Sequence, residues 1–305
     1  MTKDLRMSAK KPLIGALSAA AFSAIMAQSA YADCQIMVDP SQHEWLIHYN
    51  PITDDQAGRS FDLAIINTGD APCQGSLQIN LRGEAFGLSQ GNSGERLPYA
   101  LVDEANGSDL TPRTGQNARR INGRPVQLAP GERGLYRFHF AAMAPDRLSE
   151  GLYSQEIFVA VEGEQGHTLA ERPLNLGIQV PAAALMGLKG RFSRANGMAK
   201  IDLGELVEGV RDLDTSLFVL STSGYRVAVT SENSGRLRLG TSGWYVGYDL
   251  NIGTHAIDIQ RGGGFEVVSK KARADSYPLS VNIRDVQGKR AGDYTDVLTF
   301  TIAAL

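Results

Sequence analysis

The sequence lacks several features that would assign it to a common functional class. Its formal net charge is only −3 with both signs interspersed, so it lacks the basic surface that nucleic-acid binding requires. It also lacks an apolar run of the roughly 20 residues needed to cross a bilayer, since its longest such run covers residues 13–27. No convincing amphipathic helix follows that run. We therefore expect neither a membrane span nor a nucleic-acid partner.

Catalytic and metal-binding signatures are missing as well. The histidines do not have the spacing of a metal-binding motif such as His-Glu-x-x-His. They are His43, His48, His139, His167 and His255. Residues 91–94 and 240–243 fall short of the Gly-x-Ser-x-Gly motif. Residues 262–264 lack the Lys-Ser/Thr pair and the helix of a phosphate loop. The sequence predicts no enzymatic activity, no metal and no cofactor.

The N-terminal 32 residues have the pattern of a secretory signal peptide. Basic residues precede the apolar run of residues 13–27, and Ala30-Tyr31-Ala32 matches the small-residue cleavage site. A buried helix is the alternative interpretation. We predict cleavage after Ala32, a mature chain that begins at Asp33, and export from the cytoplasm.

The mature chain shows the pattern of an all-β protein. Short runs of alternating apolar and polar residues recur between clusters of Gly, Asn, Asp and Pro, and the chain contains 33 glycines. Such spacing is typical of β-sandwiches. The length suggests two domains. We predict a first sandwich over residues 33–181 and a second over residues 182–305.

The last strand predicted in the second sandwich is strongly apolar on one face. After Tyr294, the residues Leu298, Phe300 and Ile302 alternate with polar neighbours, which is the period of a half-buried strand. Three residues follow Ile302, too few for a further strand. In the first sandwich, by contrast, an additional alternating run follows at residues 174–180. We expect the last strand of the second sandwich to lie at an edge or beside a missing neighbour.

The 2 cysteines, Cys34 and Cys73, form an even pair in a chain predicted to be exported. Such a pair is typical of one disulfide. By loop closure, it would stabilise the first sandwich by about 3–4 kcal/mol. Two free thiols or a metal pair are the alternatives, but no His or further Cys lies nearby in the sequence. We predict the disulfide.

The ends of the two predicted sandwiches resemble each other. Gly151-Leu152-Tyr153-Ser154 and Gly292-Asp293-Tyr294-Thr295 both follow a strand and a turn and precede another strand, which indicates a repeated fold. The closing pattern Gly-x-Tyr-Thr-Asp-x-Leu-x-Phe-x-Ile resembles the spore coat protein U family, which includes subunits of archaic chaperone–usher pili. Shorter motifs in the same order extend this resemblance; they are residues 48–51, 67–69, 201–204, 221–227, 231–237 and 245–248. The second sandwich has no cysteine, and residues 83–124 match no motif of the family.

The resemblance implies two immunoglobulin-like β-sandwich domains, of which the second lacks its last strand and is completed by donor-strand complementation. Tyr294, Leu298, Phe300 and Ile302 would then line the acceptor groove. It also implies a periplasmic chaperone, an outer-membrane usher and a next pilus subunit as partners, and a fimbrium on the cell surface. Because Cys34 is the second residue of the predicted mature chain, no free donor strand precedes the first sandwich. We therefore expect a tip adhesin that promotes surface attachment and biofilm formation.

A receptor site is expected on the loops of the first sandwich, because binding residues concentrate on loops held by a rigid scaffold. The longest weakly patterned stretch is residues 83–124. Its candidate contacts with a host or abiotic surface are Phe86, Leu88, Leu97, Tyr99, Arg113, Arg119 and Arg120. A solvated insertion is the alternative for this stretch.

Two other functions are compatible with the sequence. One is a structural component of a spore coat or capsule, which would be recovered in a regular coat without an usher. The other is a secreted carbohydrate-binding or carbohydrate-active sandwich protein, for which Trp45 and Trp244 would be the sugar platforms. A core or edge position is the alternative for both tryptophans.

Overall fold

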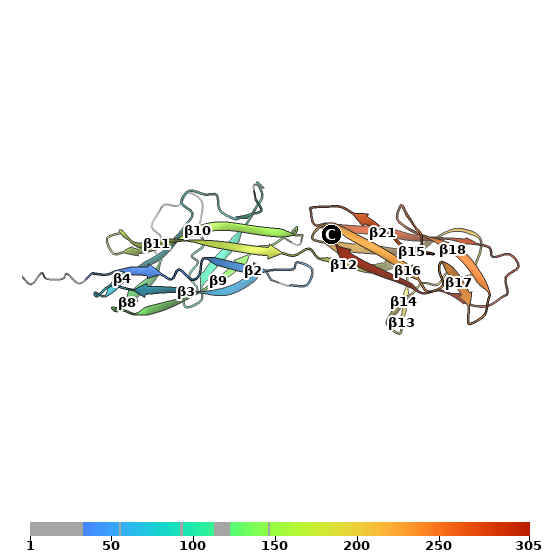
Figure 1. Cartoon of the computed structure of the whole chain (residues 1–305), viewed down its shortest axis with the longest axis horizontal. Coiled ribbons are helices and arrows are strands. Elements are labelled where there is room, and N and C mark those ends of the chain that lie inside the picture. The colour runs from blue at the N-terminus through green and yellow to red at the C-terminus, as the bar shows by residue number, and fades with distance from the viewer. Residues whose placement is uncertain (1–32, 55, 92–93, 113–122, 146) are drawn as a thin grey trace, which may run out of the picture. The chain divides into compact units, whose positions relative to one another are not determined.

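The computed structural model describes residues 33–305 except residues 55, 92–93, 113–122 and 146 (Figure 1). Within these ranges every helical or strand element is a β-strand, which confirms the predicted all-β class. The described residues contain no helix long and apolar enough to cross a membrane. The strands surround two separate clusters of buried apolar residues, one formed by residues 38–180 and the other by residues 217–283.

Two facing sheets enclose the first cluster. The order of one sheet is β1-β3-β9-β7, and that of the other is β2-β11-β10-β4-β8 with β5 and β6 attached. The strands are β1 (Ile36–Val38), β2 (Glu44–His48), β3 (Gly58–Asn67), β4 (Cys73–Asn80), β5 (Leu88–Ser89), β6 (Arg96–Leu97), β7 (Tyr99–Asp103), β8 (Arg124–Leu128), β9 (Arg133–Ala142), β10 (Gly151–Gly163) and β11 (Thr168–Val180).

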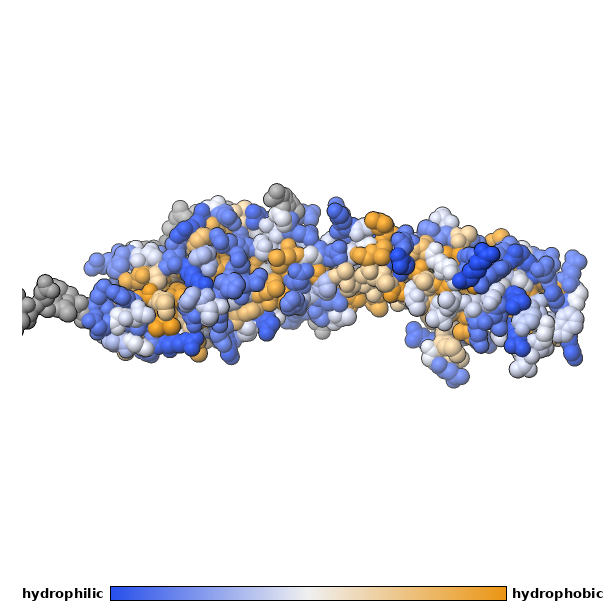
Figure 2. Space-filling view, viewed as in Figure 1, coloured by the Kyte–Doolittle hydropathy of each residue, from blue (hydrophilic) through white to orange (hydrophobic). Residues whose placement is uncertain are grey.

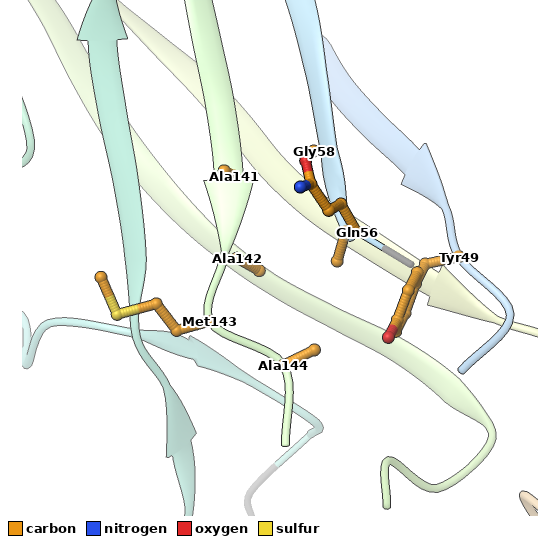
Figure 3. A pocket seen from close by; sticks show the side chains of 8 residues that line it. Tyr49, Gln56, Gly58, Ala141, Ala142, Met143 and Ala144 are labelled. Carbon is orange, nitrogen blue, oxygen red and sulfur yellow. The ribbon is translucent and has the colours of Figure 1, made fainter. Parts of the chain in front are cut away.

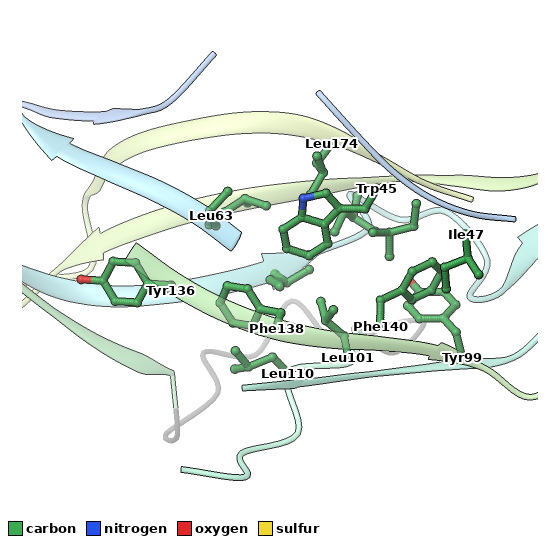
Figure 4. Packing of buried hydrophobic residues seen from close by; sticks show 14 of the residues in the cluster. Trp45, Ile47, Leu63, Tyr99, Leu101, Leu110, Tyr136, Phe138, Phe140 and Leu174 are labelled. Carbon is green, nitrogen blue, oxygen red and sulfur yellow. The ribbon is translucent and has the colours of Figure 1, made fainter. Parts of the chain in front are cut away.

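Aromatic side chains fill the centre of this first sandwich (Figure 4). Trp45 is 1% exposed, and its ring stacks on Phe61 with centroids 5.4 Å apart and lies 5.8 Å from the ring of Phe138. The interpretation of Trp45 as a core residue is therefore confirmed. β11 pairs with β10 on one side and with β2 on the other, so its inward residues Leu174 and Leu176 are fully covered.

The predicted disulfide between Cys34 and Cys73 is present. Beside it, the turn at Asn67 holds the start of the described chain. The Asn67 side chain donates to the Leu128 carbonyl and accepts from the Gly69 N–H, while the N–H groups of Asp70 and Ala71 both donate to the Asp33 carbonyl. Position 69 requires glycine, because a Cβ there would lie 2.1 Å from that carbonyl oxygen. The first strand is thus fixed from its first residues.

The second cluster also lies between two sheets. One sheet has the order β12-β15-β21-β18-β17-β22 with β19 attached, and the other has the order β20-β16-β23. The strands are β12 (Ala184–Gly190), β13 (Ser193–Ala195), β14 (Met198–Lys200), β15 (Gly209–Ser221), β16 (Tyr225–Ser231), β17 (Arg236–Leu239), β18 (Tyr245–Ile252), β19 (His255–Ile257), β20 (Gly263–Val267), β21 (Arg273–Arg284), β22 (Tyr294–Thr295) and β23 (Leu298–Ala304). β13 and β14 pair only with each other among the described strands.

Candidate functional site

β23 is an edge strand whose inward face is incompletely covered. It pairs with β16 along one side, and no other described strand pairs with its second side. Leu298, Phe300 and Ile302 pack against the second core but are only partly buried, whereas Val227 and Val229 on β16 are fully buried. Where β11 is paired on both sides, at residues 175–179, its inward residues Leu176 and Ile178 are fully buried. The predicted edge position of this strand is confirmed, and its alternate side chains remain open to solvent.

β12 forms a matching edge on the opposite sheet. Among the described strands it pairs with β15 alone, and its inward residues Ala184, Met186 and Leu188 are also only partly buried against the core. Cα atoms of β12 and β23 approach within 8 Å of one another. Figure 2 shows hydrophobic residues on the surface in the region where Figure 1 labels β12. The partly buried side chains of β12 and β23 therefore leave one side of this sandwich open. We call this side the open edge; it consists of Ala184, Met186, Leu188, Leu298, Phe300 and Ile302.

A turn at residues 221–224 holds the two edge strands together at one end. The Thr222 hydroxyl donates to the Pro181 carbonyl at 2.8 Å and accepts from the Ala183 N–H at 2.8 Å, just before β12 begins. The Ser223 hydroxyl donates to the Leu305 carbonyl at 3.1 Å, just after β23 ends. A Cβ at Gly224 would lie 2.6 Å from the Val267 carbonyl oxygen, so close backbone packing requires glycine there. These bonds give a physical reason for the Ser-Thr-Ser-Gly motif.

Asp296 fixes the other end of β23. Its carboxylate accepts hydrogen bonds from the Tyr248 hydroxyl at 2.6 Å, from the Ser231 hydroxyl at 2.6 Å and from the Asn233 N–H at 3.0 Å. Burial and, secondly, the bond to Asp296 raise the pKa of Tyr248 above its ordinary value, so its hydroxyl remains a donor at neutral pH. Asp296 lies two residues before Leu298, so these hydrogen bonds fix the start of β23.

Replacing Asp296 by alanine is expected to lower the free energy of unfolding of the second sandwich by about 2–3 kcal/mol, because it leaves the buried Tyr248 hydroxyl and two partly buried donors without their acceptor. Urea denaturation of the mature chain measures this loss. Asp293→Ala is the matched control, because Asp293 is exposed and precedes the strand. Equal midpoints for the two variants would show that Asp296 does not anchor β23.

Tyr294, the fourth residue predicted for the acceptor groove, lies in β22 rather than in β23. It is partly buried against the second core, and its hydroxyl donates to the Arg290 carbonyl at 2.8 Å. The structure therefore brings together Leu298, Phe300 and Ile302 on one strand and places Tyr294 on a short neighbouring element. Their role in accepting a strand stays a prediction.

The apolar residues proposed for receptor contact lie inside the first sandwich. Leu88, Leu97 and Tyr99 are buried, and the Phe86 ring packs against Tyr99 with centroids 4.8 Å apart. The buried amide of Gln155 accepts from the Tyr99 hydroxyl at 3.0 Å and from the Gly87 N–H at 3.0 Å. Leu88, Leu97 and Tyr99 hold the segment to the core and are not available to a partner in this conformation, whereas Phe86 is only partly buried and stays a candidate. Arg113, Arg119 and Arg120 lie outside the described residues.

A small pocket opens where β2 and β9 end and β3 begins (Figure 3). Its volume is about 280 Å³, and its walls include Tyr49, Gln56, Ala142 and Met143. No His, Cys, Asp or Glu lines it. In the described part of the chain, no three such residues are grouped so that they could hold a metal ion. Trp244 is 41% exposed on the second sandwich.

Comparison with known proteins gives structural neighbours only. No family model matches the sequence, and no curated protein matches it. One similar structure is the CsuC–CsuE chaperone–tip adhesion subunit pre-assembly complex from archaic chaperone-usher Csu pili of Acinetobacter baumannii. The identity is 13% with a TM-score of 0.48, over 88% of this chain and 99% of that chain.

Two further similar structures come from enterotoxigenic Escherichia coli. CfaE, the adhesive subunit of CFA/I fimbria, is 10% identical with a TM-score of 0.32, over 83% of this chain and 76% of its own. The CooA pilin subunit is 9% identical with a TM-score of 0.33, over 48% of this chain and 99% of its own. These values are too low to transfer a function, so any functional argument depends on the residues of the open edge.

Proposed function

We propose that the protein is an exported subunit of a chaperone–usher pilus whose second sandwich accepts a β-strand from a partner. The observation that supports this proposal is the open edge, where Met186 and Leu188 on β12 and Phe300 and Ile302 on β23 pack against the second core but are only partly buried. The proposal includes the signal peptide of residues 1–32 and the two domains, residues 33–181 and 182–305. The successive partners are a periplasmic chaperone, the usher and the next pilus subunit.

Strand addition is favourable for two physical reasons. A new strand beside β23 satisfies the backbone groups that an unpaired edge exposes. It also brings about four or five apolar side chains into the core, which contributes roughly 6–15 kcal/mol at about 1.5–3 kcal/mol each before ordering costs. This is similar to the whole stability of a typical domain, about 5–15 kcal/mol. The isolated second sandwich should accordingly be of low stability.

We further propose that the subunit occupies the pilus tip and that its first sandwich is adhesive, so that it supports surface attachment and biofilm formation. A shaft subunit needs a free donor strand before its first sandwich. After cleavage at Ala32, the first residues of the mature chain are already engaged, since Asp33 bonds the turn at Asp70 and Cys34 is in the disulfide. With Asp33 and Cys34 engaged in this way, the mature N-terminus would not be free to act as a donor strand.

The test is to mix the mature protein with synthetic peptides from the N-termini of the other subunits of its pilus. One peptide should raise the melting temperature of the second sandwich by about 10 °C or more, since 1 kcal/mol shifts a domain of this size by several degrees. A scrambled peptide of equal composition should leave it unchanged. Full stability of the protein alone, or immunogold labelling along the shaft, would contradict the proposal.

The three candidate arginines outside the described residues give a separate prediction about adhesion. Replacing Arg113, Arg119 and Arg120 together by alanine is expected to reduce attachment of piliated cells by about tenfold, a loss of roughly 1.4 kcal/mol, with an unchanged melting temperature of the mature chain. The Leu97→Ala variant is the control, because truncation of this buried side chain should act by lowering the melting temperature. Undiminished attachment by the arginine variant would remove these residues from the receptor site.

A further inference from the structure

A small β-hairpin projects from the second sandwich and contacts none of its sheets through paired strands. β13 and β14 are joined by Asn196 and Gly197, whose positive φ values of 51° and 79° suit a tight two-residue hairpin turn. Every residue from Ser193 to Lys200 is exposed, and Figure 1 shows the hairpin standing away from the neighbouring strands. A two-stranded hairpin without further support is at best marginally stable in water. Its surface is therefore available to a partner that would support it.

The hairpin and the residues that lead into it are strongly basic. Residues 182–201 include Lys189, Arg191, Arg194 and Lys200 and contain no Asp or Glu. Arg191 lies 3.4 Å from the Asp214 carboxylate, and both side chains are largely exposed. Within the described ranges, Lys189, Arg194 and Lys200 form no ion pair. The nearest acidic residue along the chain, Asp202, accepts a bond from the Gly204 N–H in its own turn.

The hairpin begins where β12 ends, so these cations stand at one end of the open edge. The Arg191 N–H donates to the Asp214 carbonyl, and the Thr215 hydroxyl donates to the Arg191 carbonyl. These hydrogen bonds hold the segment after β12 against β15 as far as Arg191, which lies two residues before β13. The opposite end of the open edge is closed by the turn at residues 221–224. A strand that lies along β12 and β23 therefore has one end beside the hairpin.

We propose that the strand-donating partner carries a pair of carboxylates directly beside its apolar segment and that the basic hairpin binds them. The inference rests on the proposed function and adds the charge pattern and the orientation of the donor. Apolar alternation alone leaves both directions of the inserted strand possible, whereas charges at one end distinguish them. Exposed ion pairs contribute more to partner choice and association rate than to affinity. The hairpin would thus select among partners whose apolar segments are similar.

Four synthetic peptides test this inference with the mature protein. Each has nine residues of alternating Val and Thr, with two Glu or two Lys at either the N-terminal or the C-terminal end. For one end, the Glu peptide should bind about three- to thirtyfold more tightly than the Lys peptide at low salt, as two or three exposed ion pairs allow. The preference should shrink at high salt, since screening weakens exposed charges. At the other end the two charges should differ less.

Charge reversal of the hairpin supplies the decisive comparison. In the variant Arg191→Glu, Arg194→Glu and Lys200→Glu the preference should reverse, and in the corresponding Gln variant it should disappear. Lys270→Glu with Lys271→Glu is the matched control, because these exposed lysines follow Ser269, whose carbonyl accepts from the Gly224 N–H at the closed end. It should leave the preference intact. Tight binding of all four peptides without a charge preference would contradict the role of the hairpin but leave strand acceptance standing. Binding of none of the peptides would contradict strand acceptance and the role of the hairpin together.

Discussion

Replacing both Cys34 and Cys73 by serine is expected to lower the free energy of unfolding of the first sandwich by about 3–4 kcal/mol. The disulfide closes a loop with a sequence separation of 39 residues, so its loss returns a large amount of conformational freedom to the unfolded chain. Denaturant unfolding followed by the fluorescence of the buried Trp45 measures the loss.

Two controls separate the disulfide from other effects of the substitution. A Trp244→Phe background removes the second tryptophan, so that the remaining fluorescence reports the first sandwich alone. Chemical reduction of the unsubstituted protein should reproduce the same loss without changing a side chain. An unfolding midpoint unaffected by both treatments would mean that the disulfide does not stabilise this sandwich.

A strand fused behind Leu305 is expected to stabilise the second sandwich by several kcal/mol, out of a gross gain of roughly 6–15 kcal/mol from burial. Leu305 lies at the turn formed by residues 221–224, where its carbonyl accepts from Ser223. A short Gly-Ser turn there would let an alternating Val–Thr strand run back antiparallel to β23. Denaturant unfolding should show a higher midpoint than that of the unfused chain.

The control fusion carries Asp at each inward position of the added strand. It offers the same backbone hydrogen bonds but places charges against Phe300 and Met186, where burial without a partner is costly. It should give no stabilisation. Equal stabilisation by both fusions would indicate that pairing with β23 is sufficient and that the half-buried side chains contribute little.

The alternation of residues 298–302 was enough to predict a half-buried final strand, because a period of two is a local property of the sequence. Its partner edge, β12, was not predicted. Ala184–Gly190 has apolar residues on both faces, since Leu185 lies exposed opposite Leu220 while Met186 faces the core. Gly187 adds no side chain to the pattern, and a Cβ there would lie 2.5 Å from the Phe218 ring. An edge strand with two apolar faces has no alternation to detect.

The hydrophobic residues between positions 86 and 99 show a second reason why the sequence could not predict the whole structure. The sequence indicated a weakly patterned segment with apolar side chains, which suits a binding loop as well as a loop anchored to a core. Gln155, which follows Gly87 by 68 residues and Tyr99 by 56, decides between these possibilities by forming hydrogen bonds with both. The same is true of Asp296, whose partners Ser231 and Tyr248 come from distant strands. Hydrogen bonds between residues so far apart in the sequence produce no periodic pattern that the sequence could reveal.

The most direct test of strand acceptance is amide hydrogen exchange along β23. Half of its N–H groups point away from β16 and have no partner among the described strands. In the mature protein alone these alternate amides should exchange quickly, while those bonded to β16 are protected. When a complementary strand is bound, protection should appear at the alternate amides of residues 298–304. Slow exchange at these amides in the free protein, or fast exchange that a bound peptide leaves unchanged, would contradict the account.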